Sequence, residues 1–88
     1  MTTDLELNRK LALAIGWRED QLVVIRGRLF IKGMLLFDHA DWQVAGPIAQ
    51  RYNLLVDFRH NIAQFNLKCY RADTPQRAIA LAVIGAGK

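Results

Sequence analysis

Apolar residues recur along this chain at two spacings, one typical of helices and one typical of strands. In three stretches, near residues 3–17, 37–53 and 73–86, apolar residues lie three or four positions apart, which predicts helices. Between them, residues 22–37 and 54–71 are rich in β-branched and aromatic residues, which predicts strands. The predicted order is α-ββ-α-ββ-α. A four-stranded antiparallel sheet packed with three helices is the simplest α+β fold with that order.

The first predicted helix has a start signal and a stop signal. Thr3 and Glu6 have the spacing of a capping box, in which the two side chains satisfy amides of the first turn. Gly16 followed by Trp17 matches a glycine stop with an apolar residue folded back on the helix. The side chains that we expect on the buried stripe are Leu7, Leu11, Ala14 and Ile15.

The central helix is predicted from residue 37 to Asn53, and either Asp38 or Asp41 is suited to cap its start. Pro47 lacks the N–H that would bond to the carbonyl of Gln43, and its ring clashes with that carbonyl. We therefore expect one bent helix, or a first turn over 40–45 followed by a reoriented helix from Pro47. The stripe on one side of this helix consists of Trp42, Ala45, Ala49 and Tyr52.

The first strand stretch is predicted to turn at Arg26-Gly27, which would pair 22–25 with 28–31. A turn at Lys32-Gly33, which would pair the longer run 22–31 with 34–37, stays open as the competing register. In the second stretch, 54–58 and 62–71 are predicted to pair around residues 59–61. Residues 62–71 alternate strictly, with Phe65, Leu67 and Cys69 facing one way and Gln64, Asn66, Lys68 and Tyr70 facing the other.

The last predicted helix begins near Pro75, where Asp73 or Thr74 is suited to cap it. Its body, residues 78–84, is apolar on every side, and such a helix is usually buried on more than one side. We therefore expect it to form the core of the fold or of a dimer. Val83 and Ile84 are its candidate self-association residues.

Composition narrows the class of protein. Eighty-eight residues, of which 52% are hydrophobic and 23% charged, predict a single domain over residues 1–88. No apolar run approaches the roughly 20 residues that span a bilayer, and the acidic start does not resemble a signal peptide. One cysteine is too few for an internal disulfide or for a zinc site built on several thiolates. We expect a cytoplasmic protein without a membrane partner.

Residue types that bind metals or act as nucleophiles are present, but their spacing is not diagnostic. Asp38, His39 and Asp41 lie close in sequence, but the two aspartates already have a capping role. Cys69 and His60 do not form a recognisable nucleophile pair, because Cys69 is expected on the apolar side of its strand. We therefore expect no catalytic residues, no metal and no cofactor, and the protein is not expected to be an enzyme.

The basic residues are the better candidates for contact with a partner. The chain has a formal net charge of +4, and its charges are scattered. If the two hairpins were adjacent, Arg28 and Lys32 would join Lys68 on one polar face, together with Gln64 and Asn66 and the aromatic rings of Phe30 and Tyr70. The candidate contacts for nucleic acid or another partner are Arg26, Arg28, Lys32, Arg59, Lys68 and Tyr70.

Three motifs together resemble the phage ABA sandwich family of small tailed-phage and prophage proteins. They are the first helix ending in Gly16-Trp17, the central Asp41-Trp42 followed by Ala45-Gly46-Pro47, and the final Thr74-Pro75-Gln76-Arg77-Ala78. The resemblance implies an α/β/α sandwich and a phage accessory protein in the bacterial cytoplasm, and it transfers no activity. With it we expect binding to a protein, either a second copy or a host defence component. A nucleic-acid-binding module is the alternative.

Overall fold

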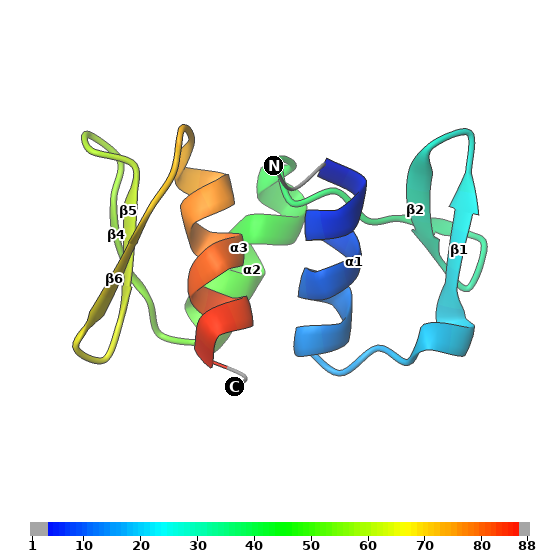
Figure 1. Cartoon of the computed structure of the whole chain (residues 1–88), viewed down its shortest axis with the longest axis horizontal. Helices are drawn as coiled ribbons and strands as arrows, with labels where there is room; N and C mark the ends of the chain where they lie inside the picture. The colour runs from blue at the N-terminus through cyan, green and yellow to red at the C-terminus, as the bar shows by residue number, and fades with distance from the viewer. Residues whose placement is uncertain (1–3, 87–88) are drawn as a thin grey trace.

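The computed structural model describes residues 4–86, which form three helices between two small antiparallel sheets (Figure 1). Figure 1 shows the sheets at opposite ends of the long axis, with all three helices between them. Strands β1 (Leu22–Ile25), β2 (Arg28–Ile31) and β3 (Leu35–Leu36) form the N-terminal sheet. Strands β4 (Leu55–Asp57), β5 (Ile62–Phe65) and β6 (Lys68–Arg71) form the C-terminal sheet.

The prediction of one four-stranded sheet was wrong, although the α+β class was confirmed. Each strand stretch contains one more turn than expected, so each folds into a three-stranded sheet of its own. The layers are therefore sheet, helices, sheet, and not the α/β/α order that the resemblance implied. Each sheet packs one face on the helices and leaves the other open, as antiparallel sheets tolerate.

The first strand stretch uses both the predicted turn and the competing one. Arg26 and Gly27, with φ of 53° and 77°, connect β1 to β2, and the register pairs Ile25 with Arg28. Lys32 and Gly33, with φ of 55° and 73°, then connect β2 to β3. Two consecutive residues at positive φ suit the right-handed twist of a hairpin, so each turn continues the sheet.

Residues 62–71 do not form one alternating strand. Asn66, with φ of 56°, lies in a two-residue turn that pairs Phe65 with Lys68. The preceding turn of this sheet, with Asn61 at φ 55°, lies where predicted. The extra turn inverts the predicted facing, so that Phe65 lies with Ala63 and Tyr70 on the inner face, and Cys69 lies with Gln64 on the outer face. The prediction that Cys69 packs in the core was therefore wrong, because its side chain is exposed.

The helices begin and end largely where the sequence predicts. Helix α1 spans Asp4–Ala14, and hydrogen bonds from Gly16 N to Leu13 O and from Trp17 N to Ala12 O form a Schellman motif. The predicted cap at Thr3 lies outside the described residues. Short 3₁₀ helix η1 (Glu19–Gln21) leads into β1.

Helix α2 spans Trp42–Arg51 as one helix that includes Pro47. Asp41 caps it by accepting a hydrogen bond from Gln43 N, and Asn53, at φ 55°, ends it. The predicted stripe holds in part, because Ala45 is buried and Ala49 and Tyr52 pack against the core, whereas Trp42 is 43% exposed.

Helix α3 (Pro75–Ala86) is the centre of the core, as predicted. It lies between α1 and the C-terminal sheet and also packs against α2 (Figure 1). Five of its side chains are at most 1% exposed: Ala78, Ile79, Ala80, Ala82 and Val83. A helix covered on several sides has no polar face, which explains the apolar sequence.

Candidate interaction surface and adjoining pocket

The open face of the N-terminal sheet is apolar. Leu29 and Ile31 of β2 are buried against the helices, so Phe30 between them points outward, together with the residues opposite it on the neighbouring strands. Cross-strand pairing places Val23 and Leu36 on either side of Phe30. We call this surface the N-terminal outer face and define it by Val23, Ile25, Phe30 and Leu36.

Three of these four side chains are well exposed. Val23, Ile25 and Leu36 are 38%, 43% and 38% accessible to solvent, and Phe30 between them is half-buried. In Figure 1 this sheet lies at one end of the molecule, with α1, α2 and α3 all on its other side. A contiguous apolar face of this kind on a small domain is a typical site of interaction with another macromolecule.

The charged residues within the segment that forms this sheet have one sign. Between Leu22 and Phe37 the sequence contains Arg26, Arg28 and Lys32 and no acidic residue. None of these three forms an ion pair within residues 4–86. The Lys32 ammonium lies 5.9 Å from the centre of the Trp17 ring, a cation–π contact. The sheet therefore combines an apolar outer face with charged side chains that are all basic.

The outer face of the C-terminal sheet has a different character. Its register places Leu55, Gln64 and Cys69 in one row and Asp57, Ile62 and Arg71 in the next. Charges of both signs and polar groups thus interrupt its apolar side chains. The N-terminal outer face is therefore the better candidate for an interaction surface.

The predicted basic contacts do not form one surface. Arg26, Arg28 and Lys32 belong to the N-terminal sheet, whereas Arg59 and Lys68 belong to the C-terminal sheet at the other end of the molecule (Figure 1). Tyr70 packs inward over α3, where a Cβ on Gly85 would lie 2.3 Å from its hydroxyl oxygen. The hairpins are therefore not adjacent, and the combined basic and aromatic face that required adjacency is absent from the described residues.

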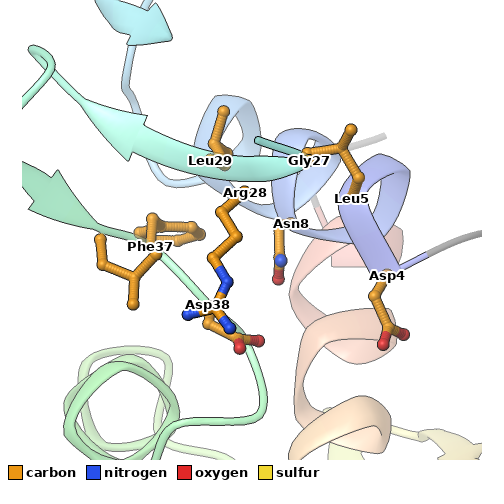
Figure 2. Close-up of a pocket in the computed structure, with 9 residues that line it drawn as sticks. Asp4, Leu5, Asn8, Gly27, Arg28, Leu29, Phe37 and Asp38 are labelled. Atoms are coloured by element: carbon orange, nitrogen blue, oxygen red, sulfur yellow. The ribbon is translucent and has the colours of Figure 1, made fainter. Parts of the chain in front are cut away.

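A pocket of about 150 Å³ adjoins the N-terminal outer face (Figure 2). Figure 2 shows Arg28 extending from β2 toward Asp38, and Asn8 projecting into the pocket from α1. Leu36 lines the pocket and also belongs to the N-terminal outer face. Charged lining groups of both signs, Arg28 with Asp4 and Asp38, give the pocket no clear preference for an anion or a cation.

Asn8 and His39 form a buried polar pair beside this pocket. Asn8 Oδ1 accepts hydrogen bonds from the backbone N–H and from Nδ1–H of His39, both at 2.7 Å. The two residues are 7% and 3% exposed. Burial lowers the pKa of His39, and the Asp38 carboxylate opposes that shift in part. His39 is therefore held as the neutral tautomer with the proton on Nδ1, and it fixes the chain just before α2 to α1.

The other candidate chemical groups lie apart. His60 Nδ1 contacts Asp57 Oδ2 at 2.9 Å in the β4–β5 turn, and this hydrogen bond holds the pKa of the Asp57 carboxyl below its ordinary value. Asp38 and Asp41 both bind backbone amides near the start of α2. Within residues 4–86, no group of three histidine, cysteine or acidic side chains is placed to hold a metal ion.

The two predicted self-association residues differ in exposure. Val83 is 1% exposed and belongs to the core of the single chain, so it is not accessible to a second copy. Ile84 is half-buried and packs against the same core. A better-exposed apolar contact is the ring pair of Trp42 and Phe58, whose centroids are 5.6 Å apart.

Sequence reasoning missed Asn8 and the N-terminal outer face. Asn8 was not singled out, although its place three residues before Leu11 on a helix was a usable signal. The outer face was missed because apolar residues on successive strand positions are normally explained by burial on both sides.

No helix within residues 4–86 has the length and hydrophobicity needed to cross a membrane. Comparison of the chain with protein-family models, curated proteins and solved structures found no match.

Proposed function

We propose that this chain is a protein-binding module without catalytic activity that contacts its partner through the N-terminal outer face. The observation that carries the proposal is the apolar row on that face, which no other element within residues 4–86 covers. Burying Val23, Ile25, Phe30 and Leu36 against a partner would remove apolar area from water, at about 25 cal/mol per Å².

The charges of the N-terminal sheet indicate the chemistry of the partner. Arg26, Arg28 and Lys32 belong to the same sheet as the apolar row, and residues 22–37 contain no acidic residue. A partner surface with apolar residues at its centre and carboxylates at its edge complements this arrangement. A second copy docked face to face would bring like charges together, so we infer a different protein as the occupant of this face.

The biological setting is part of the same proposal. The motifs of the first helix, the central helix and the final helix start resemble those of phage ABA sandwich proteins. That resemblance supports a phage or prophage accessory protein that works in the cytoplasm of a bacterial host. A host protein, such as a component of defence against phage, is then the expected partner.

Affinity capture from host lysate tests the proposal with two matched variants. Leu36→Lys places a charge on the N-terminal outer face, whereas Leu55→Lys makes the same change on the C-terminal outer face, where Leu55 is 69% exposed. We expect a host protein to be retained by the original chain and by Leu55→Lys but lost by Leu36→Lys. Retention that is equal for all three chains, or no retention by any, would contradict the proposal.

Nuclease treatment of the same lysate separates the proposal from nucleic-acid binding. The basic residues once grouped for that function lie on two sheets, so the nucleic-acid hypothesis lacks the surface on which it rested. A protein that remains bound after nuclease treatment supports direct protein contact. Material that is lost on treatment would favour the nucleic-acid-binding alternative.

A further inference from the structure

The N-terminal sheet has an open edge as well as an open face. The strand order is β1-β2-β3, so β1 is an edge strand with one row of backbone groups unpaired within the sheet. We propose that two copies of this chain pair through β1, antiparallel and centred on Val24, to form a continuous six-stranded sheet. This goes beyond the proposed function, because it uses the strand edge and leaves the N-terminal outer face open for another protein.

The four edge strands of the two sheets differ in their protection against pairing. β4 contains Asp57, β6 contains Lys68 and Arg71, and β3 is only two residues long. Charges and short length are the usual devices that stop edge strands from pairing with other chains. β1 has neither, because its four residues, Leu-Val-Val-Ile, are uncharged and rich in β-branched side chains. It is therefore the edge strand best suited to accept another strand.

The hydrogen-bond pattern of the β1–β2 hairpin fixes which backbone groups are free. Ile25 and Arg28 flank a two-residue turn, so they form a hydrogen-bonded pair, and Val23 with Phe30 forms the next one. Val24 lies between these pairs, so its N–H and C=O point away from β2 toward the open edge. No hydrogen bond from elsewhere in residues 4–86 reaches these two groups.

An axis at Val24 meets two requirements for pairing with a second copy. A two-fold axis at Val24 lets the two Val24 residues exchange N–H···O bonds with the groups that are free. Residues directly opposite each other must also face the same side of the sheet. Centring on Val24 satisfies this requirement, because it pairs Val23 with Ile25 of the second copy on the outer side.

This register gives every exposed side chain of β1 an apolar partner. Val23, Val24 and Ile25 are 38%, 50% and 43% exposed in the single chain. In the pair, the Val24 side chains meet each other on the inner side, and Val23 meets Ile25 twice on the outer side.

Charges at the two ends of the strand are compatible with antiparallel pairing. Glu19 and Asp20 precede β1, and Arg26 follows it, so the basic end of one copy lies near the acidic end of the other. Glu19 and Asp20 already form ion pairs with Arg9 and Arg18 of the same chain. The apolar contacts and backbone bonds therefore carry the association, and the charges make it compatible with two-fold symmetry.

Sedimentation of charge variants at position 24 tests the proposal. The original chain should sediment as a dimer at millimolar concentration, whereas Val24→Lys and Val24→Glu should each stay monomeric, because like charges would face each other across the axis. An equal mixture of these two variants should recover the dimer mass. An original chain that stays monomeric, or folded variants whose mixture stays monomeric, would overturn the proposal. Circular dichroism confirms that each variant is folded.

Disulfide trapping provides a second test that needs no buried charge. Cα atoms in a hydrogen-bonded antiparallel pair lie about 5.5 Å apart, a distance that a disulfide spans. Val24→Cys in a Cys69→Ser background should therefore form a covalent dimer on mild oxidation, whereas Val23→Cys in the same background should not, since Val23 faces Ile25 of the other copy. Equal trapping of both variants, or trapping of neither, would overturn the register. Leu36→Lys leaves β1 intact, so it should still form the dimer even though it loses the host protein. The result for dimerisation through β1 is therefore independent of the result for partner binding through the N-terminal outer face.

Discussion

Replacing Asn8 by alanine is the perturbation whose cost follows most directly from the structure. Asn8 Oδ1 accepts two hydrogen bonds from His39, one from the backbone N–H and one from Nδ1–H. Both donors would lose their partner in a site where His39 is 3% exposed. A buried donor without a partner costs about 1–3 kcal/mol, so the two together should cost about 2–5 kcal/mol after partial rehydration. A domain of this size has roughly 4–13 kcal/mol of stability in total.

Urea unfolding followed by tryptophan fluorescence measures this cost. We expect Asn8→Ala to lower the free energy of unfolding by about 2–5 kcal/mol with an unchanged dependence on urea concentration. A loss below about 1 kcal/mol would show that the pair is not buried as described or that water replaces Asn8 without cost.

Asn8→Asp is the matched variant, because it keeps an acceptor oxygen and adds a charge. The introduced carboxylate should raise the pKa of His39 and favour its protonated form. A histidine with a raised pKa contributes stability that is present at low pH and lost as pH rises through the folded pKa. Asn8→Asp should therefore become more stable as pH falls from 8 to 6. Stability that falls over the same range would contradict the predicted coupling.

Four further predictions concern the core, the effect of pH and nucleic-acid binding. In the core, Ile79→Ala should lower the free energy of unfolding by about 2–5 kcal/mol in urea titrations. Circular dichroism should show that Val83→Asp is unfolded, whereas Ile84→Asp should stay folded with a lower thermal midpoint. Equal behaviour of these two variants would contradict the difference in burial between Val83 and Ile84. Because burial lowers the pKa of His39, the unfolded chain binds a proton there more readily than the folded chain does. The free energy of unfolding should therefore fall as pH drops below about 6.5 and level off below the pKa of His39 in the folded chain. Urea titrations that give the same free energy of unfolding at every pH would contradict this prediction. Oligonucleotide binding measured by fluorescence anisotropy should be weak, and Lys68→Ala should change its affinity little. If Lys68→Ala instead lowered the slope of log K against log salt concentration by about one, Lys68 would contact a phosphate, which would support the nucleic-acid-binding alternative.

Local signals predicted the elements of the fold, and their assembly was harder to predict. Gly16, Asp41 and Asn53 act as helix stop, cap and stop as expected, because each role depends on residues within one turn of the helix. The sheet arrangement depends on whether Lys32-Gly33 and Asn66-Leu67 turn the chain. Both turns place a residue other than glycine at positive φ, for which sequence gives a weak signal.

The contact residues expected from the sequence are divided between the two sheets. Arg26, Arg28 and Lys32 belong to the N-terminal sheet, whereas Arg59, Lys68 and Tyr70 belong to the C-terminal sheet. The sequence shows that β1 and β2 are rich in apolar residues, but it does not show that one side of these strands faces solvent. That distinction depends on tertiary structure, because a strand covered on both sides and a strand with an apolar open face have the same pattern.

Site-specific photo-crosslinking in the bacterial host tests the central claim most directly. A photoreactive amino acid is introduced at Leu36 on the N-terminal outer face or at Leu55 on the C-terminal outer face, and irradiated cells are analysed by mass spectrometry. The account predicts a discrete adduct with one host protein from position 36 and none from position 55. An adduct from position 55 alone, or from neither position, would contradict the claim that the N-terminal outer face binds a partner.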